Sequence, residues 1–591
     1  MSFRTLYHIL SPIYRILNRK TSAETVVFCS LHGLNKTKGT RRLRLPVKTM
    51  LKRLISVFVC IVLILLPLAS CSSDGTGKQL ITPIDTAPQY LDPQIVSEIG
   101  ARNIIANCFE GLVGLDESGN IVPAAAENYD VSANRLTYTF YLRKDAKWRV
   151  TSDAGKTIGE NYEKTFDYTI TADDFVFGFR RALQPETKSP YAHALFCIEN
   201  AEKVYAGKLS SDRLAVRAID EFTLSITLER PDPDFLYTLL SPACMPCDEA
   251  FFEKTGGRYG LSTQYLIYNG PFYISTVTDT AIITKKNEDY HAASSVKPAS
   301  IYFTINSEQE TRAKKVKDGT YEASLLTASQ ADELSRKKGI TVKPFLSGEL
   351  SLLFNCKDET LSNMDIRRAI SLSFNKQPIL ELTGLASASG VIPGALRYGD
   401  EEYRKKAAVF DLSSDEKAAK AYLKSGLEAL EADDVELVIL CSTEYENAVR
   451  TVMQTWQSLF GVSFNISVEA VDSPELSSRI QKGDYQLALY NLRYLDSTAF
   501  SAVYRYTSFS RENIVGLHER QYDNIVKKIK LSRTEEQAVE AIQEAEAYLI
   551  SCAVVVPVCD TDVYIGLAKG VEGIVFTPAG DTMYFKNAVK K

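Results

Sequence analysis

Residues 137–142, Thr-Tyr-Thr-Phe-Tyr-Leu, decide the fold class, because small polar and large apolar side chains alternate along them. Such alternation is typical of a β-strand that buries one face. Residues 222–228, Phe-Thr-Leu-Ser-Ile-Thr-Leu, repeat the pattern. Between the two segments, Thr171 precedes Asp173 and Asp174, which is typical of the first turn of a helix. A helix between two strands favours an α/β protein.

Apolar patterns elsewhere in the chain predict further helices and strands. A helix from Thr171 would bury Phe175, Phe179 and Ala182 on one face, since they recur at helical spacing. Further apolar patterns predict strands at 435–440 and 553–558 and helices that begin near Asn363, Tyr445 and Thr534. Pro557 weakens the second of these strands, because proline cannot donate to a sheet.

The N-terminal part carries a secretion signal. A basic segment, residues 41–53, precedes the uncharged apolar run 54–66 and then Leu68-Ala69-Ser70-Cys71. This order is typical of a signal peptide. The apolar run is shorter than the roughly 20 residues that span a bilayer. The last four residues resemble the bacterial lipobox, which implies that Cys71 is acylated and becomes the mature N-terminus.

The signal divides the chain into segments of different kinds. Met50 stands directly before the signal, so we expect translation to begin there. Residues 1–49 would then be an upstream extension without a fold, and residues 50–70 the signal peptide. The small polar residues that follow Cys71 predict a flexible tether at 71–78.

The charge of the remaining chain excludes one class of partner. Residues 1–70 hold 12 of the 68 Lys and Arg residues and one of the 73 acidic residues, so residues 71–591 carry a net charge of −16. A protein this acidic is a poor binder of nucleic acid. Its length is enough for two or three domains.

No constellation of catalytic or metal-binding residues is visible. Cys244 and Cys247 form a single C-x-x-C, and without a second pair we favour structural or free thiols over a redox or zinc site. His518-Glu519 lacks the second histidine of a zinc protease, because residue 522 is Tyr. There is no nucleophile elbow, P-loop or dinucleotide fingerprint. We therefore predict neither an enzyme nor a bound cofactor or metal.

Short segments along the chain resemble one family in their sequence and order. The family comprises the extracellular solute-binding proteins of peptide and nickel ABC importers, family 5, and the resemblance covers nearly all of residues 80–591. The segments are 91–93, 108–113, 122–127, 136–140, 142–148, 171–176, 180–183, 189–192, 269–273, 354–355, 366–370 and 483–485.

The resemblance implies a two-lobed α/β clamp of the periplasmic-binding-protein type II, with an extra small inserted domain. Ligand would bind between lobes I and III and close them by a hinge motion. The implied parts are lobe I at 79–114, 218–298 and 566–591, inserted domain II at 115–217, and lobe III at 299–565.

The resemblance also implies a function. The protein would be a lipid-anchored, monomeric receptor on the extracytoplasmic face of the cell membrane, in the periplasmic space or at the cell surface. It would capture peptides and deliver them to ABC permease subunits. In peptide-binding relatives an extended peptide pairs with cleft strands through backbone hydrogen bonds.

The resemblance places Ser97 and Ile99 on the lobe I edge of the cleft. On the other lobe, Tyr490 stands where relatives have Trp, and Arg493 stands where they have the Asp that holds the peptide's α-amino group. Tyr494 and Asp496 complete the candidate ligand-binding residues.

Arg493 leaves two accounts open, because a guanidinium cannot accept a hydrogen bond from an ammonium group. The ligand presents an anion to Arg493, or the loop is shifted and Asp496 takes the amine. The first account leaves open that the ligand is a non-peptide solute: a sugar, a metal chelate or a haem-like ligand. A surface hydrolase and a receptor for signalling peptides are the remaining alternatives.

Overall fold

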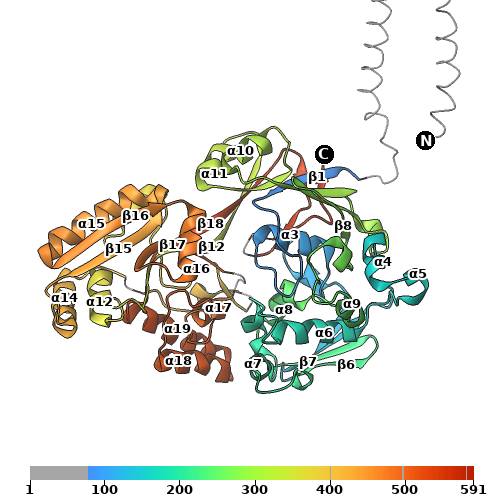
Figure 1. The fold of residues 1–591 in the computed structure, drawn as a ribbon, viewed down its shortest axis with the longest axis horizontal. Helices are drawn as coiled ribbons and strands as arrows, with labels where there is room; N and C mark the ends of the chain where they lie inside the picture. Colours follow the sequence, from blue (N-terminus) through green and yellow to red (C-terminus); the bar gives the residue numbers. More distant parts are fainter. Residues whose placement is uncertain are drawn as a thin grey trace, which may run out of the picture. The chain divides into compact units, whose positions relative to one another are not determined.

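The computed structural model describes residues 77–399, 401–410, 412–494, 498–510, 512–578, 580 and 582–591, without the side chains of 346 and 347 (Figure 1). The predicted extension, signal peptide and Cys71 lie outside the described residues, as does Asp496. The described residues form one compact unit. No helix among the described residues is both long and apolar enough to cross a membrane.

The first sheet joins segments that are more than 200 residues apart. β1 runs parallel to β10, and β9 and β8 continue the sheet in antiparallel order. Helix α3 contacts β8 and the short β21. These elements are β1 (Gln79–Ile84), β10 (Ser300–Ile305), β9 (Ala281–Lys286), β8 (Phe272–Val277), α3 (Ile99–Cys108) and β21 (Met583–Tyr584).

The second sheet contains residues 137–142, the stretch in which polar and apolar side chains alternate. Its strands lie in the order β4 (Ala126–Val131), β5 (Thr137–Leu142), β7 (Thr223–Thr227), β6 (Val216–Asp220). This confirms the two predicted strands. Helix α6 (Ala172–Leu183) contacts β6 and β7 and begins with a capping box between Thr171 and Asp174, which confirms the predicted helix. The domain limit predicted after residue 217 falls within β6.

The third sheet has six strands, in the order β11-β18-β12-β17-β15-β16. β15 confirms the strand predicted at 435–440, and β18 begins within the stretch predicted at 553–558 and continues to Leu567. The strands are β11 (Ala323–Leu326), β18 (Val555–Leu567), β12 (Thr341–Phe354), β17 (Leu487–Arg493), β15 (Val435–Ser442) and β16 (Phe464–Val471).

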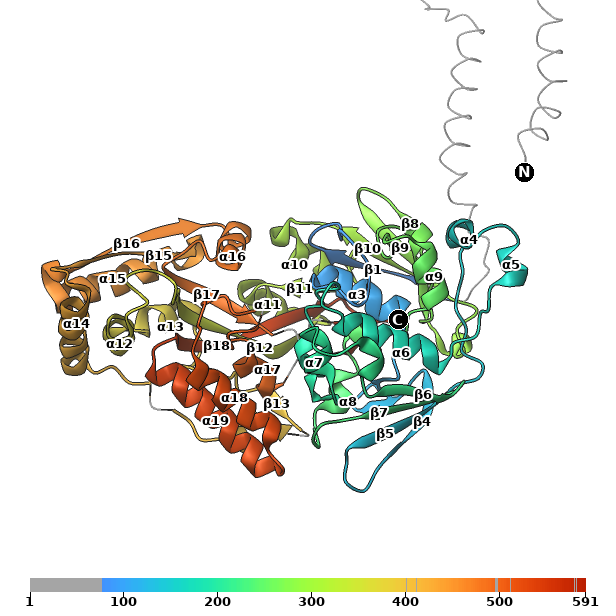
Figure 2. The ribbon, with the colours of Figure 1, turned by 60° about the horizontal axis from the view of Figure 1, so that its bottom comes forward.

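Two strands of this sheet, β12 and β18, are much longer than the others. In Figures 1 and 2, β12 and β18 extend from the sheet of β15 and β16 toward the region of β1 and α3. Their antiparallel register shifts twice, between Leu346 and Gly348 and between Leu350 and Ser351. Pro557 pairs with Ser351 beside the second shift, where a missing backbone donor is tolerated.

The predicted helices beyond α6 are confirmed as α12 (Met364–Ser373), α15 (Glu446–Phe460) and α19 (Glu535–Ser551). A second hydrophobic core lies among β12, β15, β17, α12 and α15 and contains Trp456. The remaining helices are α4 (Ser152–Ile158), α5 (Tyr162–Thr165), α7 (Ala201–Tyr205), α8 (Phe235–Thr238), α9 (Glu249–Lys254), α10 (Gln309–Lys317), α11 (Ala328–Ser335), α13 (Gln377–Thr383), α14 (Glu416–Leu430), α16 (Ser473–Lys482), α17 (Ala499–Tyr504) and α18 (Arg520–Leu531).

The remaining strands are short and pair two by two. They are β2 (Val113–Leu115) with β3 (Ile121–Pro123), β13 (Arg397–Tyr398) with β14 (Glu401–Glu402), β19 (Val571–Glu572) with β22 (Val589–Lys590), and β20 (Val575–Phe576) with β21.

Two of the family-like sequence segments meet in a buried ion pair. The guanidinium of Arg181 donates to both carboxylate oxygens of Asp92, from Nη2 at 2.7 Å and from Nη1 at 3.3 Å. Nη1 also donates to Gln94 Oε1 at 2.5 Å. The ring of Phe252 lies 4.1 Å from the guanidinium carbon. Both charged side chains are about 5% exposed, so this contact fixes α6 against residues 91–94.

A second pair of segments meets through backbone groups. Asn269 accepts from the N–H of Glu110 at 3.0 Å and donates to its carbonyl at 2.7 Å. Gly270 lies so close to residues 108 and 109 that an added Cβ would stand 2.6 Å from their backbone atoms. The Asn-Gly pair is therefore required by a close approach of two backbone segments.

Candidate ligand-binding site

A cavity of about 550 Å³ lies between three segments of the chain. The segments are the stretch around the short 3-10 helix η1 (Ala192–Cys197), the end of β17 with α16, and the residues that follow α17. Ser97 contributes from the start of the chain. The lining residues are Ser97, Lys188, Ser189, Pro190, Ala192, His193, Phe196, Tyr205, Ser477, Gln481, Tyr490, Asn491, Leu492, Arg493, Tyr504, Arg505, Phe509, Ser510, Glu512 and Ile514.

The structure brings three of the six predicted site residues together here: Ser97, Tyr490 and Arg493. The Tyr490 hydroxyl lies 2.9 Å from Ser477 Oγ. Ile99 is the first residue of α3 and does not line the cavity. Tyr494 is buried, and its hydroxyl donates to the Val391 carbonyl at 3.4 Å, so it faces away from the cavity.

Strand β17 presents backbone groups to this cavity. It pairs with β12 along its whole length, Leu487–Arg493. On its other edge it pairs with β15 only at Leu487 and Ala488. The outer edge of residues 489–493 therefore has no strand partner among the described residues, and four of these five residues line the cavity. An exposed edge of this kind accepts an additional strand.

Arg493 extends from the end of this strand into the cavity and is exposed. No carboxylate of the described residues forms an ion pair with it. Desolvation lowers the pKa of Arg493; Tyr490 and Asp85 oppose that effect, and Arg102 adds to it. The guanidinium is thus open to water and crowded by protein atoms, as expected for a side chain inside a cleft.

Arg505 is buried and contacts the backbone of Arg493. Its Nη2 donates to the Arg493 carbonyl at 2.9 Å and to Glu512 Oε2 at 3.1 Å. The ring of Tyr494 lies 4.5 Å from its guanidinium carbon. Burial alone would lower the pKa of Arg505, but the charge of Glu512 raises it above its ordinary value. Arg505 therefore stays charged and supports the end of β17.

Aromatic rings form another wall of the cavity. His193 stacks on Tyr504 with ring centres 5.4 Å apart, and Phe196 meets Tyr504 edge-on at 5.9 Å. Phe509 lies 5.8 Å from Tyr504 and is 51% exposed, which is unusual for so large an apolar side chain. Beside this wall, Lys530 of α18 joins α18 to α7 through an ion pair with Glu202 at 2.9 Å.

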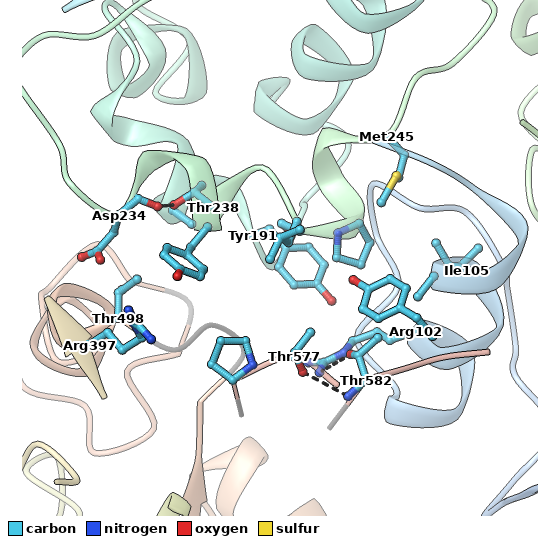
Figure 3. Close-up of a pocket in the computed structure, with 18 residues that line it drawn as sticks. Arg102, Ile105, Tyr191, Asp234, Thr238, Met245, Arg397, Thr498, Thr577 and Thr582 are labelled. Atoms are coloured by element: carbon cyan, nitrogen blue, oxygen red, sulfur yellow. Dashed lines mark hydrogen bonds between the residues drawn. The ribbon is translucent and has the colours of Figure 1, made fainter. Parts of the chain in front are cut away.

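A smaller cavity of about 80 Å³ lies close by and is shown in Figure 3. Arg102 of α3 reaches Thr582 on one side of it, with Nη2 3.4 Å from Thr582 Oγ1. Asp234, Arg397 and Thr498 stand on the other side (Figure 3). Tyr191 lines this cavity, and its neighbour Ala192 lines the larger one. The two cavities therefore lie close together, on either side of residues 191 and 192.

The cavity walls contain residues that the sequence did not single out: Lys188, His193, Phe196 and Phe509. The only available signal was that the family-like segment 189–192 stands among them. Periodicity could not reveal these residues, because the cavity joins segments some 300 residues apart in the chain.

The described residues also bear on metal and thiol chemistry. No group of three or more His, Cys, Asp or Glu residues there is placed to hold a metal ion. Cys244 and Cys247 are free, buried thiols. Burial raises the pKa of Cys247 to about 12. A thiol of this kind is unreactive, which favours the structural interpretation of the C-x-x-C pair.

The three sheets and the cavity between distant segments define an α/β protein with a cavity large enough for a small ligand. A family model described as bacterial extracellular solute-binding proteins, family 5 (middle), matches residues 120–513. The chain belongs to this family, and the resemblance predicted from the short sequence segments is confirmed.

Curated relatives agree with this assignment, and a solved structure shares the fold. The dipeptide-binding protein of Lactococcus lactis is 28% identical over 72% of this chain and 78% of its own length. The oligopeptide-binding protein OppA of Bacillus subtilis is 25% identical over 92% of this chain and 100% of its own. Listeria monocytogenes OppA bound to peptide has a TM-score of 0.72 at 21% identity, covering 88% of this chain and 100% of that one. The predicted two-lobed α/β fold is that of these binding proteins.

Proposed function

We propose that the protein captures peptides in the cleft lined by β17 and delivers them to an ABC permease. One observation carries the proposal: the outer edge of residues 489–493 is unpaired among the described strands and faces a cavity of about 550 Å³. This volume lies within the range of small-ligand sites. The names of the curated relatives, dipeptide- and oligopeptide-binding proteins, support a peptide as the ligand.

The peptide would bind as an added strand. Its backbone N–H and C=O groups exchange hydrogen bonds with the free edge of β17, so affinity comes from groups that every peptide shares. Side chains of the peptide would alternate between the two faces of the extended sheet, one of which carries Tyr490 and the other Arg493, because residues three apart in a strand point to opposite faces. The protein would hold the peptide without any covalent step.

The lobes would close around the peptide by a hinge motion about the strands β12 and β18. These strands extend from the sheet of β15 and β16 toward the region of β1 and α3. Their two register shifts interrupt the regular ladder, and such bulges are places where strands bend. We propose the lobe limits predicted from the family, with one adjustment: domain II extends to Thr227, because β6 and β7 complete its sheet.

Attachment to the membrane completes the proposal. A diacylglyceryl group on Cys71 would hold a monomeric receptor on the extracytoplasmic face, close to its permease. Metabolic labelling with a radioactive fatty acid tests this step. We expect label in the native protein and none in Cys71→Ser; equal labelling of both proteins would disprove the anchor.

The added-strand mode has its own test in backbone-modified peptides. A bound peptide would be resynthesised with single N-methyl groups, each of which removes one backbone donor. We expect affinity losses of about tenfold at alternate positions only, because every second residue of a strand points its N–H toward the partner edge. Uniformly small losses would refute pairing with β17 while leaving peptide binding intact.

A further inference from the structure

The charges that line the larger cavity are unbalanced. Lys188 and Arg493 are both exposed on its walls, and neither forms an ion pair with a carboxylate of the described residues. Lys188 is held at a φ of 55°, a conformation that non-glycine residues seldom adopt. Among the described residues that line the cavity, Glu512 is the one acid, and it already pairs with Arg505. The cavity therefore offers cationic groups to its contents.

Arg505 adds donors that the protein itself leaves unused. Its Nε and Nη1 are buried and have no hydrogen-bond acceptor among the described residues. Unpaired buried donors are costly, and a carboxylate can satisfy two guanidinium N–H groups at once. Nearby acids do not supply it among the described residues: Glu512 accepts only from Nη2, and Glu349, the other acid whose charge is felt at Arg505, forms no ion pair with it.

Beside these cations, the exposed ring of Phe509 and the ring of Tyr504 form an apolar surface. An exposed aromatic side chain in a concave site is typical of a surface that a ligand covers. The cavity thus combines an anion-binding end with an aromatic wall.

We propose that the cavity selects peptides that carry a carboxylate beside an aromatic or large aliphatic side chain. Arg493 and Arg505 bind the carboxylate, Lys188 attracts it at the rim, and Tyr504 and Phe509 cover the apolar side chain. The inference rests on the proposed function, since it names the class of peptide that the same site takes. The carboxylate belongs either to an acidic side chain or to the C-terminus of the peptide.

The first experiment offers the protein a mixture of peptides, because the proposal names a class of peptide and not one sequence. The purified protein is incubated with a peptic digest of casein, washed, and denatured, and the retained peptides are sequenced by mass spectrometry. A second sample uses the same digest after methyl esterification of its carboxyl groups. We expect acidic peptides with aromatic or large aliphatic residues to be enriched from the first digest and retention to fall at least tenfold with the second.

Synthetic analogues then separate the two sources of the carboxylate. The most enriched peptide is compared by calorimetry with its C-terminal amide and with its Glu→Gln or Asp→Asn analogue. We expect one of the two changes to weaken binding by about 10- to 100-fold, because hydrogen bonds between charged groups are strong. The change that weakens binding identifies the source.

Protein variants assign the residues. Arg493→Ala should lose the preference for the carboxylate, so that the peptide and its uncharged analogue bind equally, and Arg493→Lys should restore part of it. Phe509→Ala should weaken the binding of peptides with an aromatic or large aliphatic side chain and leave the carboxylate preference in place. Arg479→Ala is the matched control, because Arg479 is ion-paired with Glu469 at 2.6 Å outside the cavity. Asp496→Asn tests the alternative in which that residue holds the peptide amine.

The outcomes are distinct. Retained peptides without acidic enrichment, or an Arg493→Ala variant that keeps the preference, would overturn the inference while peptide binding stands. A loss of affinity in Asp496→Asn with none in Arg493→Ala would overturn it in favour of the amine account. Failure to retain any peptide would count against the proposed function itself.

Discussion

Replacing Asp92 by Asn tests how the chain is held together near the cleft. Asp92 and Arg181 form two charge-assisted hydrogen bonds, at 2.7 and 3.3 Å, and both side chains are about 5% exposed. Asparagine keeps the shape of the side chain and removes its charge. Arg181 would then remain a buried cation whose partners, among them Gln94 and the Phe252 ring, carry no negative charge.

The magnitude follows from the burial of the pair. Removing one partner of a buried ion pair costs about 3–5 kcal/mol, because the other charge stays desolvated. Since asparagine can still accept one hydrogen bond from the guanidinium, we expect about 3 kcal/mol for Asp92→Asn. The loss should be confined to the part of the protein that contains α6.

The two tryptophans make the assay local. Trp148 is buried near α6, and Trp456 is buried in the second core between Phe374 and Phe464. Urea unfolding is followed by fluorescence in Trp456→Phe and in Trp148→Phe backgrounds, so that each transition reports one region. Asp92→Asn should shift the Trp148 transition to lower urea and leave the Trp456 transition in place.

A compensating variant controls for general damage. Changing Arg181 to Met together with Asp92→Asn removes the unpaired cation, and we expect part of the lost stability to return. An Asp92→Asn protein within about 0.5 kcal/mol of the native protein, or a double variant less stable than either single one, would refute the reasoning from the buried pair.

Three further predictions follow from other buried contacts. Gly270→Ala should destabilise by about 2–4 kcal/mol in thermal unfolding, since its Cβ would stand 2.6 Å from backbone atoms, whereas Gly114→Ala, with its nearest atom at 3.5 Å, should be near neutral. Desolvation raises the pKa of fully buried Glu349 well above 4.5, so above pH 4.5 the folded state keeps a proton that the unfolded state releases. The free energy of unfolding should therefore fall as the pH rises above 4.5, by up to about 1.4 kcal/mol per pH unit. Glu349→Gln should flatten this dependence of stability on pH between pH 5 and 7. Cys356 is the one cysteine of the described residues that is not buried, so a thiol reagent at pH 8 should modify the native protein there first, and Cys356→Ala should abolish that phase.

Local signals in the sequence were sufficient for much of the fold. The alternation in residues 137–142 and the capping pattern at Thr171 act over a few residues, and the structure has β5 and α6 at these places. The length of β12, 14 residues, was not predictable, because its pairing with β18 and β17 depends on segments far along the chain. The domain limit predicted after residue 217 falls inside β6, because the sequence does not show that β6 joins the sheet of β4 and β5.

The site was predictable only in part. Tyr490 and Arg493 were found through their position in the family pattern, and the structure places both on the cavity wall. Tyr494 follows Arg493 directly, but the end of β17 turns it inward to Val391. Phe509 gave no signal in the sequence, because its exposure results from the way three distant segments enclose the cavity.

Native mass spectrometry of the purified protein tests the central claim most directly. The claim is that the cleft beside β17 holds a peptide. We predict a population heavier than the bare chain by the mass of short peptides, which collisional activation releases and fragmentation sequences as amino acids. A protein that carries a non-peptide molecule in that cleft, or that stays bare after incubation with a peptide digest, would contradict the account.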